Sequence, residues 1–234
     1  MNINPIKIKN VLVYPFKDMQ SLIDYSVDKK KLLLSLNAEI IMKAEDDVAE
    51  IINNNIGYAD GYGAIKAMNQ KGERNLERIP GCELWLELIK KFYPDSKFYL
   101  IGSTEETINK TVDKLKIDFP SIQIAGFRNG FIKTQEEKVR LIADIKEKQP
   151  DFVFVAMGFP IQERLMNELH KQHRATYLNL GGSFDVYTGK VTRAPRWIQN
   201  LGMEWFYRFV TNPSRYKRQI VYLQFLTSYF MKKL

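Results

Sequence analysis

The amino-acid sequence predicts an α/β fold with a Rossmann-like, mostly parallel sheet that carries helices on both faces. Short apolar runs alternate with longer stretches of helical periodicity, which is the order of strands and crossover helices. The run FVFVAM at 152–157 is apolar without alternation, which is typical of a parallel strand buried on both sides. The 234 residues, 45% of them hydrophobic, are enough to enclose a substantial core.

Strands and helices are expected in alternation along most of the chain. The expected strands are short apolar runs, at 9–16, 31–37, 56–59, 97–102, 121–126, 151–158 and 175–181. The expected helices are 18–28, 38–54, 62–71, 82–93, 104–117, 134–148 and 160–172, and a helical tail begins near residue 195. No linker or repeat interrupts this order, so we expect an α/β domain at 1–194 and a basic, aromatic helical appendage at 195–234.

The net charge of +8 is concentrated at the end of the chain. Residues 190–234 contain nine basic residues and one acidic residue, so the rest of the chain is neutral overall. This asymmetry indicates an anionic partner for the tail, such as phosphates, nucleic acid or a membrane surface.

The cellular location is expected to be cytoplasmic. The single cysteine, Cys82, excludes an intramolecular disulfide framework and suits a reducing compartment. The N-terminal sequence has no secretory signal pattern, and no run of about 18 uncharged apolar residues predicts a spanning helix.

Polar and glycine-rich residues follow several of the expected strands. In open parallel sheets, ligands bind outside the carboxyl ends of the strands, where helix N-termini also point. The residues at these ends are Ser35 and Asn37, Asp60, Gly102 to Thr104, Gly158 to Gln162, and Gly181, Gly182 and Ser183. We therefore expect them to line one site.

Asp60, in YADGYG at 58–63, is the candidate catalytic carboxylate. An aspartate before glycine is more often a turn residue when only these six positions are considered. Asn37, Arg78 and Gln162 in other loops of the same edge favour a functional role, in which Asp60 accepts a proton from a sugar hydroxyl as general base.

Two further stretches each allow a structural and a functional interpretation. In GFPIQE at 158–163, Pro160 and Glu163 suit a helix start, which leaves Gln162 as a candidate ligand contact. In GGSFDVYTGK at 181–190, the backbone N–H groups of a glycine-rich turn could hold a diphosphate, and a tight connection explains the turn equally well.

No cofactor or metal is expected. The GYG of residues 61–63 lacks the third glycine of a dinucleotide fingerprint, because Lys66 stands there. His170 and His173 share a helix face without further histidines, and no D-x-D triplet is present. Arginines and backbone amides are expected to neutralise any phosphates.

The tail combines arginines with aromatic residues. Wrapped as a helix, 216–233 is apolar nearly all round, so it packs against the body, against another subunit, or in a membrane interface. Aromatic residues with basic ends favour the membrane, and a homo-oligomer is the alternative. Nothing resembles a nucleic-acid-binding module, so no nucleic-acid partner is expected.

Five motifs together resemble the WecG/TagA/CpsF family of bacterial glycosyltransferases. They are YADGYG (58–63), ERIPGCEL (77–84), VAMGFPIQE (155–163), GGSFDVYTGKVTRAP (181–195) and LGMEWFYRFVTNPSRYKRQ (201–219). Their order and spacing match the family over nearly the whole chain, from about residue 10 to 225.

The resemblance implies an inverting, metal-independent hexosyltransferase of cell-surface polysaccharide synthesis. Such an enzyme moves a sugar from a UDP-sugar to an undecaprenyl-diphosphate-linked N-acetylhexosamine at the inner face of the cell membrane, to which it binds peripherally. N-acetylmannosamine, its uronic acid and a glucose-type sugar all remain possible donors. A non-catalytic nucleotide-binding or membrane-scaffold protein of the same fold is the alternative.

The resemblance also implies roles for individual residues. Asp60 takes the position of the proposed base. The positions of substrate-binding residues are taken by Ser35, Asn37, Arg78 and Gln162. Arg208, Arg215 and Arg218 take the positions of arginines that meet the diphosphate of the lipid-linked acceptor.

Overall fold

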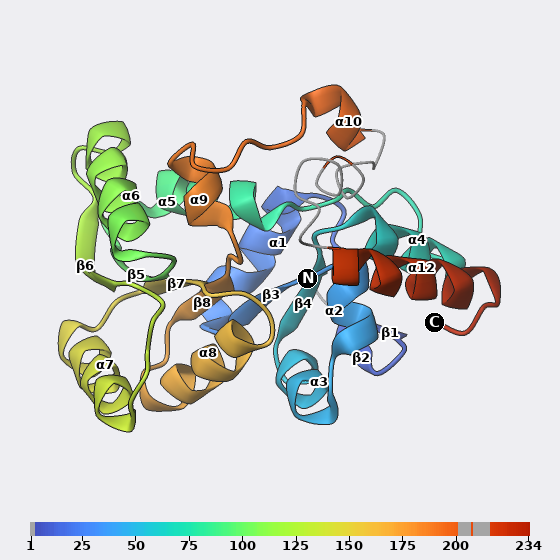
Figure 1. Cartoon of the computed structure of the whole chain (residues 1–234), viewed down its shortest axis with the longest axis horizontal. Coiled ribbons are helices and arrows are strands. Elements are labelled where there is room, and N and C mark those ends of the chain that lie inside the picture. Colours follow the sequence, from blue (N-terminus) through green and yellow to red (C-terminus); the bar gives the residue numbers. More distant parts are fainter. Residues whose placement is uncertain (1–2, 201–206, 208–215) are drawn as a thin grey trace.

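A six-stranded parallel sheet forms the centre of the molecule in the computed structural model, which describes residues 3–200, 207 and 216–234 (Figure 1). The strands lie in the order β4-β3-β8-β7-β5-β6, and every neighbouring pair is parallel. They are β3 (Leu32–Leu36), β4 (Ile56–Ala59), β5 (Lys97–Gly102), β6 (Gln123–Arg128), β7 (Phe152–Ala156) and β8 (Thr176–Asn179). The predicted Rossmann-like α/β class is confirmed.

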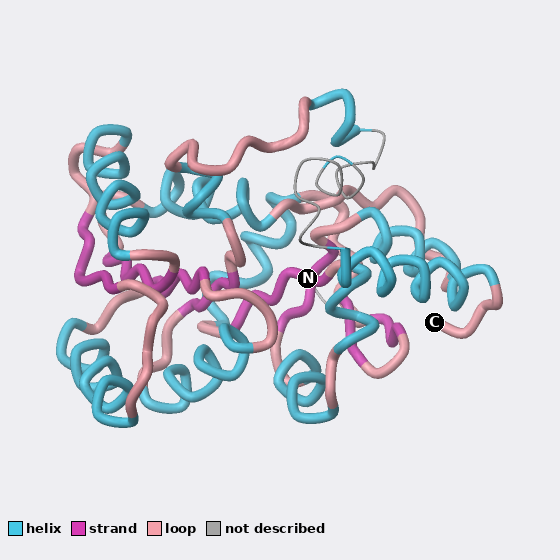
Figure 2. The backbone as a smooth tube through the Cα atoms, viewed as in Figure 1, coloured by secondary structure: helices cyan, strands magenta, loops and turns pink. Residues whose placement is uncertain are grey.

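Helices cover both faces of this sheet, as the tube view makes plain (Figure 2). One face carries α1 (Met19–Ser26), α5 (Gly81–Phe92), α6 (Glu105–Asp118) and α9 (Ser183–Tyr187). The other carries α2 (Ala38–Lys43), α3 (Asp46–Asn53), α7 (Gln135–Lys148) and α8 (Ile161–Gln172). Beyond β4 lies α4 (Tyr62–Gln70), and the short helices η1 (Val27–Lys29) and α10 (Arg196–Asn200) complete the connections.

The side chains of β7 explain why the fold could be recognised from its apolar runs. Phe152 and Phe154 join the core under α5 and α6, whereas Val153 and Val155 join the core under α7 and α8. All four are buried. A strand covered on both faces has no position for a polar side chain, so its sequence loses the alternation of a half-exposed strand.

The expected strand at 9–16 is wrong in its bounds, and the strands observed there do not join the main sheet. Residues Ile6–Ile8 (β1) and Val11–Val13 (β2) form an antiparallel hairpin that is separate from the main sheet. Lys9 turns the chain with a φ of 56°. After the hairpin, the Tyr14 N–H donates to the Gly57 carbonyl at 2.8 Å, so this segment covers the free edge of β4.

The expected helix at 38–54 is two helices. Ala44, at the end of α2, has an extended backbone with a ψ of 108°. Asp46 and Asp47 then occupy the first turn of α3, where carboxylates favour a helix N-terminus.

The last described helix, α12 (Tyr216–Phe230), packs against α2 and α4 at the β4 side of the sheet (Figure 1). Phe225 is fully buried there, and the Gln70 Nε2 donates to the Tyr229 carbonyl at 2.9 Å. The separation into domains at 1–194 and 195–234 stays a prediction. None of the helices in the described ranges is long and apolar enough to cross a membrane.

Candidate active site

The loops that follow β3, β4, β5, β7 and β8 lie together because all these strands are parallel. We call them the rim, which comprises residue 37 and residues 60–63, 102–104, 157–162 and 180–183. The fold thus places the sequence-predicted residues of these loops along one edge, where parallel sheets bind ligands.

Asp60 begins the loop after β4 and is half-buried. Its N–H donates to the Leu36 carbonyl at 3.0 Å, which ties it to the end of β3. Asn37 lies beside it, since a Cβ added at Gly61 would be 3.1 Å from the Asn37 Cβ. The Asn37 Oδ1 accepts the Ile40 N–H at 3.1 Å and so caps α2, a use that occupies only the oxygen of this side chain.

Gly63 allows a helix contact next to Asp60. A Cβ added at Gly63 would lie 3.0 Å from the Ala38 Cβ and 3.2 Å from a ring carbon of Phe225. Both distances are tighter than ordinary van der Waals contact, so the missing side chain lets α2, α4 and α12 meet closely. Both glycines that follow Asp60 therefore have packing roles, Gly61 against Asn37 and Gly63 against Ala38 and Phe225.

Tyr58, two residues before Asp60, was not singled out by the sequence. Its hydroxyl lies near Gly81, where an added Cβ would be 3.2 Å away, and near the buried Ser35. The oxygen is buried without a well-formed hydrogen bond to any described residue, although Ser35 is close enough to affect its pKa. Burial, and then the charge of Asp60, raise the pKa of Tyr58 well above its usual value.

Arg78 reaches the same part of the rim from the irregular segment before α5. The Ile79 N–H donates to the Ala59 carbonyl at 2.9 Å, which places this segment beside the end of β4. The guanidinium of Arg78 lies over the Tyr62 ring, 5.4 Å from its centroid. Ser35, Asn37, Asp60 and Arg78 are therefore brought together at the ends of β3 and β4.

Gln162 lies at the other part of the rim, in the first turn of α8, and is buried. Its Oε1 accepts the N–H of Gly158 at 3.1 Å and that of Gly181 at 3.0 Å. Its Nε2 donates to the Glu163 Oε1 at 2.9 Å. The amide group of Gln162 thus joins the ends of β7 and β8.

Glu163 and Asn179 complete this network, and the sequence analysis missed both. Glu163 had been assigned to the helix dipole, yet only 1% of it is exposed. Its Oε1 also accepts from the Asn179 Nδ2 at 2.8 Å, while the Asn179 Oδ1 accepts the Ser35 N–H at 2.7 Å. We call Gln162, Glu163 and Asn179 the buried amide network.

Burial raises the pKa of Glu163, and the hydrogen bonds from Asn179 and Gln162 oppose this rise. Its second oxygen, Oε2, is buried and has no hydrogen-bond partner among the described residues. The sequence signal that could have found Glu163 is its place beside Gln162 on a helix that follows a fully buried strand.

The turn at 181–183 is largely held by its own bonds. Gly181 has a φ of +55°, a conformation that favours glycine, and its N–H is bound by Gln162. The Ser183 N–H and hydroxyl both donate to the Leu180 carbonyl, at 3.1 and 2.6 Å. Gly182 is exposed, and a Cβ added there would meet open space.

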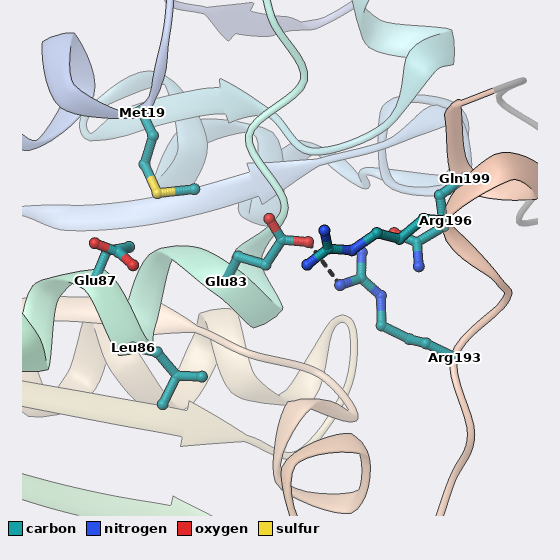
Figure 3. Close-up of a pocket in the computed structure, with 7 residues that line it drawn as sticks. All are labelled: Met19, Glu83, Leu86, Glu87, Arg193, Arg196 and Gln199. Atoms are coloured by element: carbon teal, nitrogen blue, oxygen red, sulfur yellow. Dashed lines mark hydrogen bonds and ion pairs between the residues drawn. The ribbon is translucent and has the colours of Figure 1, made fainter. Parts of the chain in front are cut away.

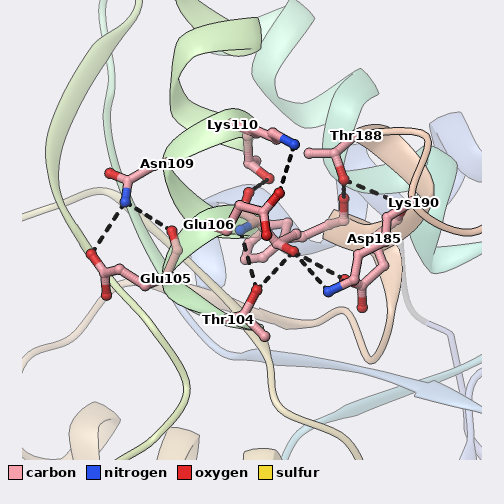
Figure 4. A network of polar contacts seen from close by, with 11 residues as sticks. Thr104, Glu105, Glu106, Asn109, Lys110, Asp185, Thr188 and Lys190 are labelled. Atoms are coloured by element: carbon pink, nitrogen blue, oxygen red, sulfur yellow. Dashed lines mark hydrogen bonds and ion pairs between the residues drawn. The ribbon is translucent and has the colours of Figure 1, made fainter.

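Next to this turn, α9 is joined to the loop after β5 (Figure 4). The Asp185 Oδ1 accepts from the Ser103 hydroxyl at 3.0 Å and lies 3.5 Å from the Lys190 Nζ. Thr104 caps α6 in the same cluster by accepting the Thr107 N–H at 3.3 Å. Hydroxyl, carboxylate and ammonium groups therefore gather at the β5 end of the rim.

A groove of about 500 Å³ lies where the chain passes over the start of α5 (Figure 3). Its lining residues are Met19, Glu83, Leu86, Glu87, Arg193, Arg196 and Gln199. The Arg193 Nη1 and the Glu83 Oε1 form an ion pair at 2.7 Å across it.

The three arginines predicted in the tail fall outside what the structure describes. Arg208 and Arg215 lie outside the described residues, and Arg218 belongs to α12 with its side chain outside the description. His170 and His173 each bind a backbone carbonyl, of Lys30 and Pro150, through Nε2. Among the described residues, no group of three or more His, Cys, Asp or Glu side chains is arranged to hold a metal ion.

A comparison with known protein families agrees with this architecture. The family model described as "Glycosyl transferase WecG/TagA/CpsF family" matches residues 6–234, which is nearly the entire chain.

Proposed function

The chain belongs to the WecG/TagA/CpsF family of glycosyltransferases, and on this premise we propose that it transfers a sugar from a UDP-sugar to a lipid-linked acceptor. The acceptor is an undecaprenyl-diphosphate-linked N-acetylhexosamine, and the donor sugar is N-acetylmannosamine, its uronic acid or a glucose-type sugar. The reaction is inverting, needs no metal, and takes place at the cytoplasmic face of the membrane.

One observation supports Asp60 as the general base. It is a half-buried carboxylate at the carboxyl end of a parallel strand, with Asn37 beside it and Arg78 in the neighbouring segment. In the proposed step, Asp60 takes the proton of the acceptor hydroxyl while the oxygen of that hydroxyl attacks the anomeric carbon of the donor sugar. The bond from that carbon to UDP breaks, and UDP leaves with the electron pair.

The leaving diphosphate needs positive charge or N–H donors. Arg78 is the candidate cation near Asp60, and the exposed turn at Gly182 is the candidate amide site at the opposite part of the rim. In this assignment Ser35, Asn37, Gln162, Gly181 and Ser183 shape the pocket of the donor. Arg208, Arg215 and Arg218 are proposed to meet the acceptor diphosphate.

The outer face of α12 supports peripheral binding to a membrane. Ile220, Leu223 and Phe230 are 52%, 61% and 76% exposed, and they recur at helical spacing. The exposed Lys232 and Lys233 follow at the end of the helix. An apolar stripe that ends in lysines suits insertion between anionic lipid headgroups.

The proposal is tested by Asp60→Asn, which keeps the size of the side chain and removes its basicity. We expect the transfer rate to an undecaprenyl-diphosphate-linked N-acetylglucosamine to fall by about 10²- to 10⁴-fold, whereas UDP binding stays unchanged. Asp113→Asn, an exposed position on α6, is the matched control. Near wild-type turnover in Asp60→Asn would remove Asp60 as the base, and wild-type protein without turnover would favour the non-catalytic alternative.

The membrane part is tested separately by Leu223→Glu. We expect less of the protein to sediment with vesicles that contain anionic lipid, because the anionic headgroups would repel the new carboxylate. Ile117→Glu on α6, where the side chain is 76% exposed, is the control for adding charge at an exposed apolar position. Equal losses in both variants would argue against α12 as the membrane-binding surface.

A further inference from the structure

Gln162 uses its whole carbonyl group inside the protein. An amide oxygen has two lone pairs, and the N–H groups of Gly158 and Gly181 donate to it at 3.1 and 3.0 Å. The side chain is 3% exposed. This oxygen is therefore committed to the backbone at the ends of β7 and β8 and has no lone pair left for a sugar hydroxyl.

The orientation of this amide depends on Glu163. If the Gln162 amide were flipped, its NH₂ would face two N–H donors and its oxygen would face a carboxylate. In the observed orientation the Nε2 donates to the Glu163 Oε1 at 2.9 Å, so every contact joins a donor to an acceptor.

The same oxygen of Glu163 orients Asn179. The Asn179 Nδ2 donates to it at 2.8 Å, which turns the Asn179 Oδ1 toward the Ser35 N–H at 2.7 Å. One carboxyl group thus determines which way two amides point, and those amides bind the backbone at the ends of three strands, β3, β7 and β8.

We propose that Glu163 is a positioning residue of the transferase, which orders the donor side of the rim through Gln162 and Asn179 rather than by touching the substrate. This inference rests on the proposed function, because it assigns the nucleotide diphosphate to the loops that the buried amide network holds. It also changes the role of Gln162 from a ligand contact to an internal brace. A buried carboxyl group with one oxygen shared by two amides and the other oxygen unpartnered is costly to keep for stability alone.

The first readout is amide hydrogen exchange in the full chain, which does not depend on any ligand. In Glu163→Ala, we expect at least tenfold faster exchange of the Ser35, Gly158 and Gly181 N–H groups. Glu163→Gln keeps an acceptor oxygen for both amides and should recover most of this protection. Glu168→Gln makes the same change at an exposed position of α8 and should leave all three rates unaltered.

The second readout is the binding of UDP by titration calorimetry. We expect Glu163→Ala to weaken UDP binding at least tenfold and Glu163→Gln to restore it to within about threefold. Leu169→Ala, in the core under the same helix and away from the rim, should lower the melting temperature without changing the UDP affinity. This comparison separates positioning from general stability.

A folded Glu163→Ala variant with unchanged exchange at the three amides and unchanged UDP affinity would overturn the proposal. If Glu163→Ala does not fold, Glu163→Asp replaces it, since it retracts the carboxyl group by one methylene and should give the same losses. Wild-type protein that does not bind UDP would contradict the proposed donor, whereas the exchange rates would still decide whether Glu163 orders the rim.

Discussion

The β7–β8 part of the rim (residues 157–162 and 180–183) is braced by buried side-chain hydrogen bonds, whereas the β4 part (residues 60–63) combines backbone hydrogen bonds with apolar contact to a helix distant in the sequence. At the β7–β8 part, the buried amide network joins three strand ends through directional hydrogen bonds. At the β4 part, the Asp60 loop is followed by α4, where Gly63 admits Phe225 of α12 into close apolar contact.

These interactions differ in how strictly they fix the groups that they join. Hydrogen bonds between buried groups fix both distance and direction, and breaking one leaves an unsatisfied partner. Apolar contacts are non-directional, so α12, which packs through Phe225 and accepts a hydrogen bond from Gln70 at its Tyr229 carbonyl, can shift at a smaller cost. We therefore propose that the backbone donors of the β7–β8 part bind the donor diphosphate, and that the β4 part admits the lipid-linked acceptor.

The comparison is tested most strongly by Phe225→Ala. Phe225 is fully buried, so its truncation should make the free energy with which α12 packs on the body less favourable by about 3–5 kcal/mol. We expect rapid hydrogen exchange within Tyr216–Phe230 and unchanged exchange at the Gly158 and Gly181 N–H groups. Leu223→Ala, on the exposed face of the same helix, should have little effect on either. Loosening at Gly181 in Phe225→Ala would mean that the two parts act as one unit.

A smaller effect is expected from Asn179→Ala at the β7–β8 part. The change leaves the Ser35 N–H without its acceptor and removes one donor to Glu163, which should cost about 1–3 kcal/mol in the free energy of unfolding. Urea denaturation measures this loss, and Asn109→Ala on the exposed face of α6 is the control. Exchange within α12 should not change, and a comparable acceleration there would contradict the separation of the two parts.

The smallest effect is a pH dependence that belongs to Glu163. Its pKa in the folded protein is raised above the ordinary 4.5, so the folded state holds this proton more tightly than the unfolded state does. The resulting stability is present below about pH 4.5 and is lost as the pH rises through the folded pKa. Between pH 4.5 and 7, the free energy of unfolding of Glu163→Gln should therefore improve relative to that of the wild type. A constant difference between the two proteins would show that the carboxyl group does not titrate in this range.

Much of the rim could be predicted from the sequence because its residues follow strands of a recognisable type. Ser35, Asn37, Asp60, Gln162 and the turn at 181–183 each stand directly after an apolar run, and a parallel sheet collects such positions at one edge. Tyr58, Glu163 and Asn179 were missed because each looks ordinary in its own segment. The local pattern predicts ordinary strand residues at Tyr58 and Asn179, and at Glu163 it predicts a charge that favours a helix N-terminus.

The family model supports the transferase class that the five motifs predicted. The assignment of individual residues to donor, acceptor and membrane stays a prediction, with Arg208 and Arg215 outside the described part of the chain.

Local periodicity in the sequence was enough to predict the α/β class, the parallel strands and the edge at which the polar and glycine-rich loops gather, because a strand covered on both faces has a recognisable apolar pattern. Three features became visible only in the folded structure. Residues 6–13 form a separate hairpin, Gly63 packs against Phe225, and the amide oxygen of Gln162 accepts backbone N–H groups of the protein itself. Those features depend on partners far away in the chain. The acceptor of a given N–H, or the ring that fills the space beside a glycine, is set by strand order and helix packing, which a local pattern of residues does not contain.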